Sequence, residues 1–218
     1  MKAKEIESKI LQHYQSFEYD QAIKLMLSNK DVFSPIDFHY NLGTLFLKNK
    51  NFTVARYHLE KALSKGRIDE GVFNNLNASK MFLGVAEIES EHSFWTQKAD
   101  TLYSLPVWPF VTVGLLITIA YLVVQKVNKT KNTIGFLICT LIAFLPFLIK
   151  VSFFNTANFA ITFKDIELRE GPAPVFEVTR TLPKGLKIVV GDPTEGWVMV
   201  KSPVEYSGWA KLSDLGVL

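Results

Sequence analysis

The strongest constraint in this sequence is a pair of long apolar runs near its centre. Val107–Val124 contains no charged residue over about 18 positions, which is the minimum length for a transmembrane helix. Thr133–Ile149 is equally free of charge. Two such runs, joined by the polar residues 125–132, predict a two-helix transmembrane hairpin with spans of about 107–125 and 133–152. The two ends of this hairpin would lie on one side of the membrane.

The hairpin divides the 218-residue chain into three predicted segments, residues 1–104, 105–154 and 155–218. Each flanking segment is long enough to form one small domain. The formal net charge is only +3 and no basic run is clustered, so the composition argues against nucleic-acid binding. The single cysteine, Cys139, lies inside the second apolar run and can form no intrachain disulfide.

Residues 1–104 have the pattern of short amphipathic helices that repeat along the chain. Ala22 and Ala55 lie 33 residues apart, and the dipeptides Asn41-Leu42 and Asn75-Leu76 lie 34 residues apart. A period of about 34 is typical of the tetratricopeptide repeat (TPR), a helix–turn–helix unit. Small residues such as Gly43 allow two helix backbones to approach closely. The segment therefore resembles a short, all-α TPR array.

Two departures accompany this resemblance. Lys50 stands where a turn glycine is usual, and no closing proline follows near Arg67. The outer repeats are degenerate, as terminal capping repeats often are. TPR arrays bind extended peptides in a groove lined by their first helices, so the resemblance implies that Asn41 and Asn75 lie in such a groove. The alternative is that both are ordinary polar residues on a solvated face.

The last segment, residues 155–218, changes to short runs of alternating and β-branched residues. Glycine and proline turn signals separate these runs. Five short strands at this spacing predict an all-β small barrel. The clearest predicted strands cover residues 160–163, 176–179, 187–190 and 197–200.

Four landmarks in this segment resemble the bacterial SH3 domain in order and spacing: Ile166–Pro172, Leu182–Gly185, Glu195–Val200 and Ser207–Ala210. The resemblance implies a domain that binds peptides or cell-wall fragments. Its candidate surface residues are Arg169, Glu170, Trp197, Tyr206 and Trp209. The alternative for the two tryptophans is that they anchor the core of the barrel.

A TPR array, a membrane hairpin and a bacterial SH3 domain occur in this order in the BatE proteins of the Bacteroides aerotolerance (Bat) systems, which this chain resembles. The resemblance implies an inner-membrane protein that works beside von Willebrand factor A-domain membrane proteins and a MoxR-type ATPase in envelope stress tolerance. We therefore expect a membrane-anchored interaction scaffold. The alternative is a cell-wall (peptidoglycan) sensor or anchor that acts through the barrel.

The loop between the two apolar runs bears on sidedness. It contains Lys126, Lys129 and Lys131 and no acidic residue. The positive-inside rule therefore predicts that residues 125–132 are cytoplasmic and that both flanking segments are periplasmic. Met1–Ser16 has no apolar core of the length that a signal peptide requires. The alternative, that both flanking segments are cytoplasmic, therefore stays open.

The sequence shows no Gly-rich phosphate loop, nucleophile elbow or paired-carboxylate motif. The four histidines lack metal-ligand spacing, although His39 and His58 can approach each other across a helical pair. Neither apolar run carries an internal charge, which argues against a transport subunit. We expect a binding protein with no catalytic residue, metal or cofactor.

Overall fold

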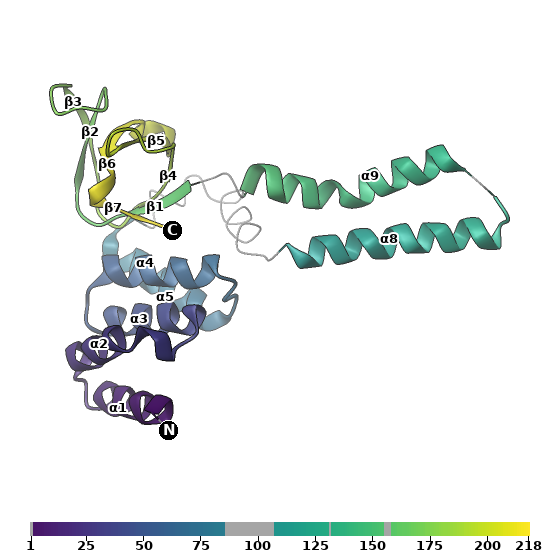
Figure 1. Ribbon diagram of the computed structural model, residues 1–218. Coiled ribbons are helices and arrows are strands. Elements are labelled where there is room, and N and C mark those ends of the chain that lie inside the picture. The colour runs from purple at the N-terminus through teal and green to yellow at the C-terminus, as the bar shows by residue number, and fades with distance from the viewer. Residues whose placement is uncertain (1, 86–106, 131, 155–157) are drawn as a thin grey trace. The chain divides into compact units, whose positions relative to one another are not determined.

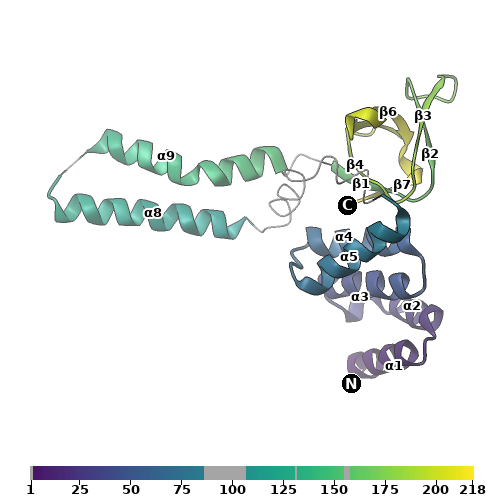
Figure 2. The same ribbon diagram turned by 180° about the vertical axis from the view of Figure 1, so that it is seen from behind.

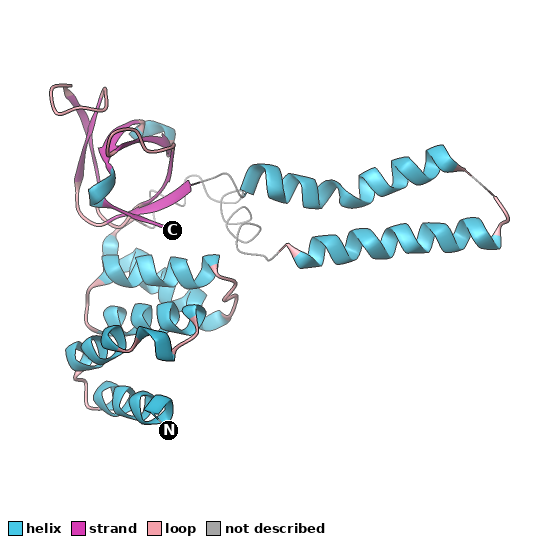
Figure 3. Cartoon of the chain, in the orientation of Figure 1, coloured by secondary structure: helices cyan, strands magenta, loops and turns pink. Residues whose placement is uncertain are grey.

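The computed structural model describes residues 2–85, 107–130, 132–154 and 158–218 (Figure 1). The chain forms two compact units, Met1–Gln97 with Asn158–Leu218, and Lys98–Ala157. The first unit contains a helical part and a β part, and the second contains two long apolar helices (Figure 3). This order of helical, apolar and β parts agrees with the prediction from sequence. The predicted boundaries at 104–105 and 154–155 involve residues outside the described ranges.

Residues 2–85 form five α-helices and one 3₁₀ turn: α1 (Lys2–Gln15), α2 (Tyr19–Ser28), η1 (Lys30–Val32), α3 (Pro35–Lys48), α4 (Phe52–Ser64) and α5 (Glu70–Leu83). A capping residue directly precedes each of the helices α3, α4 and α5: Ser34, Asn51 and Asp69, respectively. Each of these side chains accepts a hydrogen bond from the backbone N–H three residues later. Such caps satisfy donors that have no partner within the helix. The helix starts are therefore encoded locally.

Helices α3 and α4 pack at close range because Gly43 has no side chain. A Cβ atom at Gly43 would lie 2.6 Å from the Cγ of Leu59. Ala55 on α4 is fully buried, which agrees with the expected role of small residues in this pair. The turn between the two helices places Lys50 in the left-handed region, with φ 62°. Glycine adopts that conformation without steric cost, so Lys50 keeps the turn geometry at an energetic disadvantage.

Two clusters of buried apolar side chains stabilise the helical part. One cluster joins α2 to α3, and the other joins α4 to α5. Each fully buried leucine, isoleucine or methionine contributes about 1.5–3 kcal/mol relative to an exposed position. The buried members are Ala22, Ile23, Met26, Phe38, Leu42 and Leu45 in the first cluster and Leu59, Ala62, Leu63, Val72 and Leu76 in the second.

The β part is a seven-stranded antiparallel sheet with the strand order β3-β2-β6-β5-β4-β1-β7. The strands are β1 (Asn158–Thr162), β2 (Ile166–Arg169), β3 (Val178–Leu182), β4 (Lys187–Val190), β5 (Trp197–Ser202), β6 (Gly208–Lys211) and β7 (Leu215–Val217). The sequence predicted five strands. The strands β2, β6 and β7, which span three or four residues each, are not among the four clearest predicted strands.

The outer strands of this sheet are β3 and β7, each of which pairs with one other strand among the described residues. Figures 1 and 2 show β2 and β3 extending as a hairpin beyond the other strands. Four of the five residues of β3 are exposed. The sheet therefore has an accessible edge at β3.

The helical part and the β part share buried contacts. Val85, which follows α5, belongs to the apolar cluster that fills the β part. Arg56 on α4 is fully buried and donates a hydrogen bond to the carbonyl oxygen of Gly185. The Nζ of Lys187 donates to the Glu60 carboxylate at 2.9 Å. These contacts make the two parts one unit, although they are far apart in the sequence.

The second unit contains α8 (Trp108–Val127) and α9 (Thr133–Ile149), and a π-helical turn, η2 (Lys150–Phe154), continues α9. Two helical stretches, Trp108–Val127 and Thr133–Ser152, are long and apolar enough to cross a membrane. Only 6% and 11% of their residues are buried. The core helices of a soluble protein would be mostly buried, so the apolar surface of both helices fits a lipid environment better.

Candidate functional site

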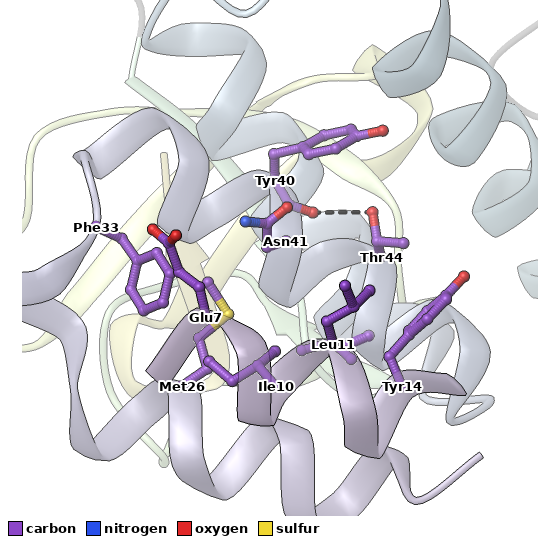
Figure 4. A pocket seen from close by; sticks show the side chains of 10 residues that line it. Glu7, Ile10, Leu11, Tyr14, Met26, Phe33, Tyr40, Asn41 and Thr44 are labelled. Carbon is purple, nitrogen blue, oxygen red and sulfur yellow. Dashed lines mark hydrogen bonds between the residues drawn. The ribbon is translucent and has the colours of Figure 1, made fainter. Parts of the chain in front are cut away.

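The helical part contains a pocket between α1 and α3, with a volume of about 270 Å³ (Figure 4). We call it the α1–α3 pocket. Apolar and aromatic side chains dominate its lining, as is usual for ligand pockets. It is lined by Glu7, Ile10, Leu11, Tyr14, Met26, Phe33, Tyr40, Asn41, Thr44 and Leu45.

Helical periodicity explains why these residues meet. Glu7, Leu11 and Tyr14 recur at intervals of three and four residues and therefore share one face of α1. Asn41 and Leu45 share one face of α3 in the same way. Figure 4 shows Glu7 near one end of the pocket and Tyr14 near the other, with Asn41 on the facing helix.

The two asparagines predicted for a peptide groove both belong to the α1–α3 pocket, one in its lining and one behind it. Asn41 lines the α1–α3 pocket directly. Asn75 on α5 donates through Nδ2 to the Oγ1 of Thr44 at 3.1 Å, and Thr44 lines the same pocket. The Thr44 hydroxyl in turn donates to the carbonyl oxygen of Tyr40. Asn75 therefore lies one hydrogen bond behind the pocket wall and supports it.

Asn41 differs from Asn75 in its hydrogen bonding. Within the described parts of the chain, the side-chain amide of Asn41 has no hydrogen-bond partner, although this residue is partly buried. An asparagine amide supplies two donors and an acceptor with two lone pairs. These groups match the N–H and C=O groups of a peptide main chain. The Asn41 amide is thus a polar group of the pocket that is available to a ligand.

The aromatic walls of the pocket are held from behind. The ring of Tyr14 contacts that of Tyr19 edge to face, with 5.7 Å between the ring centroids. The guanidinium of Arg67 lies 3.6 Å from the centre of the Tyr40 ring. Arg67 is itself paired with Asp37 at 3.1 Å. A pocket with walls fixed in this way loses little side-chain entropy when it binds a ligand.

Sequence reasoning missed the contribution of α1 to this site. The repeated positions lie on α2, α3, α4 and α5, and none lies on α1, so the repeat pattern does not point to Glu7. Its signal is visible in hindsight, because Glu7 interrupts the otherwise apolar face formed by Ile10, Leu11 and Tyr14. A carboxylate on an apolar helical face indicates a binding site more strongly than a carboxylate on a fully polar face does.

The histidine pair lies elsewhere in the helical part. Nδ1 of His39 and Nδ1 of His58 are 2.9 Å apart, so the two rings meet across the helical pair. Burial, assisted by nearby lysines, lowers the pKa of each histidine to about 4. Both rings are therefore neutral at pH 7, with one nitrogen donating to the other. No cluster of three or more potential metal ligands occurs among the described residues.

The five candidate residues of the β part occupy different environments. Arg169 donates through Nη1 to the carbonyl oxygens of Pro174 and Phe176, so it holds the loop that follows β2. Glu170 begins this loop and is exposed. Trp197 has only 8% of its surface exposed.

The remaining two candidates lie on or near β6. Trp209 is partly exposed and lies opposite Arg169 in the register of β6 and β2. Tyr206 packs against the core of the β part. The structure thus places Arg169 beside Trp209, whereas Trp197 and Tyr206 mainly support the fold.

Comparison with known proteins finds no relative: no family model, curated protein or solved structure matches the chain.

Proposed function

We propose that this protein is a membrane-anchored interaction scaffold whose α1–α3 pocket binds an extended segment of a partner protein. The observation that carries this proposal is the combination of apolar walls with the available amide of Asn41. The resemblance of the helical repeats to TPR arrays supports it, because α1 and α3 each begin a helical pair. TPR arrays bind peptides on the face formed by such first helices.

The β part supplies a second contact in this proposal. Its loop between β2 and β3 is braced by Arg169 and exposes the side chains of Val175 and Phe176, which are 85% and 41% exposed. Two binding surfaces on one anchored chain raise the effective concentration of each for a shared complex. The resemblance to bacterial SH3 domains supports a binding role for this part.

The resemblance to BatE proteins suggests which partners to test first. We infer von Willebrand factor A-domain membrane proteins, together with a MoxR-type ATPase, in a Bat-type envelope stress-tolerance complex. The apolar hairpin would hold the scaffold in the same bilayer as these partners, so that binding takes place between molecules confined to one surface.

Site-specific photo-crosslinking in cells tests the proposal directly. A photoreactive benzoylphenylalanine replaces Leu11, which lines the pocket and is 55% exposed. The matched control replaces Leu27 on α2, which is 50% exposed and does not line the pocket. We expect position 11 to crosslink to a von Willebrand A-domain protein and position 27 to give no such product.

Two further variants test whether the crosslinked partner is bound through the two asparagines. Asn41→Ala combined with Asn75→Ala should abolish the product at position 11, because the main-chain contacts and the Thr44 support are lost together. Asn74→Ala, at an exposed neighbouring position on α5, should leave it unchanged. A product of equal yield in the double variant would refute the assignment of the pocket.

A cell-wall sensor or anchor is the second candidate function. The partly exposed ring of Trp209 beside Arg169 favours it, since an aromatic face next to a cation suits a sugar ring and its polar substituents. Sedimentation of the detergent-solubilised protein with purified cell wall separates the two functions. Co-sedimentation that is lost in Trp209→Ala would support the sensor, and its absence would favour the scaffold.

We propose a two-pass topology in a bacterial inner membrane, with residues 125–132 in the cytoplasm and the helical and β parts in the periplasm. The lysine-rich loop supports this orientation. In a Cys139→Ser background, single cysteines at Ser64, Thr130 and Ser213 can be labelled with an impermeant reagent in intact cells. Labelling at 64 and 213 but not at 130 is expected. Labelling at 130 alone would place both soluble parts in the cytoplasm.

A further inference from the structure

The charge of the α1–α3 pocket is one-sided. Its lining contains one carboxylate, that of Glu7, and no lysine, arginine or histidine. A pocket with apolar walls and a single negative group discriminates between ligands by charge as well as by shape. The proposed function specifies only an extended segment of a partner protein. The negative charge of the pocket indicates in addition which side chains that segment carries.

The Glu7 carboxylate has no ion-pair partner among the described residues. On the same helix, Lys9 pairs instead with Glu5, with Nζ and Oε1 2.8 Å apart. The carboxylate is exposed at the rim, and Asn41 lies across the pocket from it on α3 (Figure 4). The pocket therefore offers an acceptor for a cation on α1 and, on α3, an amide that is available to a main chain.

The interior of the pocket accepts apolar groups. Ile10, Met26, Phe33 and Leu45 line it, and its volume of about 270 Å³ falls just below the usual range for small-molecule sites. This volume is enough for one large aliphatic or aromatic side chain of a bound segment. A segment in which an apolar residue lies beside a basic one would fill both parts of the site.

We infer that the α1–α3 pocket selects extended segments in which a large apolar residue is adjacent to a lysine or arginine. The apolar side chain enters the pocket, the Asn41 amide binds the main chain, and the Glu7 carboxylate binds the cation. Acidic and phosphorylated segments are disfavoured, because they would place a second negative charge beside Glu7. This inference rests on the proposed function, since it concerns the ligand of the same site.

A charge-reversal selection tests it. The full-length protein in detergent micelles is the target, and a phage-displayed library of random heptapeptides is the probe. The wild-type protein should enrich peptides with adjacent apolar and basic residues. Glu7→Lys should enrich apolar residues next to aspartate or glutamate instead. Glu5→Lys, on the same helix but outside the pocket, should enrich the wild-type pattern.

Affinity measurements give the expected size of the effect. For one peptide from the wild-type selection, Glu7→Gln should weaken binding about two- to fivefold, as expected for an ion pair at an exposed rim. Salt should reduce this difference. Glu5→Gln should not change the affinity.

The outcomes separate this inference from the proposed function. If the selected peptides require Asn41 for binding and yet contain no excess of lysine or arginine, that result would overturn the inference and leave the scaffold proposal standing. Apolar peptides that are enriched equally by wild-type and Glu7→Lys proteins would do the same. A failure to recover any peptide whose binding is lost in Asn41→Ala would overturn both.

Discussion

The buried charge network between α4 and β4 makes a strong prediction about stability. The Glu60 carboxylate accepts a hydrogen bond from Lys187 at 2.9 Å and lies 3.8 Å from the guanidinium of Arg56. The side chains of Arg56, Glu60 and Lys187 are 0%, 3% and 10% exposed. Glu60→Gln keeps the shape of the side chain but removes the carboxylate that faces both buried cations.

The expected loss of stability follows from this burial. Removing one partner of a buried ion pair typically costs about 3–5 kcal/mol, because an uncompensated charge remains away from water. Small proteins are stable by only about 5–15 kcal/mol. Glu60→Gln should therefore lower the stability of the first unit by a large fraction of its total.

Urea unfolding of the full-length protein in detergent micelles measures this loss. Far-UV circular dichroism follows the helices, and in a Trp95→Phe, Trp108→Phe background tryptophan fluorescence follows Trp197 and Trp209 in the β part. In the wild type the two signals should change together, because the two parts share a core. Glu60→Gln should lower the midpoint and separate the two signals.

The matched control is Glu5→Gln, which removes a solvated ion pair with Lys9. It should leave the midpoint unchanged, because exposed pairs contribute little. A shift for Glu60→Gln that is no larger than this control would refute the argument that buried charges join the two parts.

The same network predicts a dependence on pH. Burial alone would raise the pKa of Glu60, but the cations of Lys187 and Arg56 lower it below its ordinary value of 4.5. Its contribution to stability is therefore fully present above pH 4.5 and is lost as the pH falls through the lower folded-state pKa. Wild-type protein should lose more stability than Glu60→Gln between pH 5 and pH 3.

Three further predictions concern the helical part and use thermal unfolding as the measurement. Gly43→Ala should destabilise it by about 1–3 kcal/mol, because the added Cβ would lie 2.6 Å from Leu59; an unchanged midpoint would contradict the close packing. Lys50→Gly should stabilise it by about 0.5–1 kcal/mol, because the residue has φ 62°, whereas a loss would show that the turn relaxes. Because His39 and His58 have pKa values of about 4 when folded and an ordinary value of 6.5, stability should fall as the pH drops from 7 to 5. This loss should be smaller when both histidines are replaced by glutamine.

The sequence predicted those features that depend on local patterns. The apolar spans were visible because no charge interrupts them, and the helices of residues 2–85 were visible from their periodicity. The strands β2, β6 and β7 were less clear: β7 has only three residues, and β2, although its residues alternate, runs directly into the turn signal Glu170-Gly171-Pro172. Asn41 and Asn75 were found because they recur at one repeat length. The TPR assignment of the helical part and the SH3 assignment of the β part stay predictions.

Long-range features could not be predicted from one sequence. Arg56 and Glu60 look like a solvated pair on an exposed helix turn, and nothing near them in the sequence indicates their burial against Gly185 and Lys187. Glu7 was missed for a related reason, because its meaning depends on α3, which packs beside it. In each case the decisive partner belongs to another element of the fold.

The buried network also has a consequence for biosynthesis. Glu60 and Lys187 are separated by 127 residues, and the apolar hairpin is translated between them. At about 5–20 residues per second, a ribosome takes roughly 6–25 s to cover that distance. During this interval the nascent helical part must stay soluble without its β partner. Arg56 and Glu60 form an i,i+4 pair that water can solvate until Lys187 arrives, whereas an apolar patch at this place would be open to aggregation.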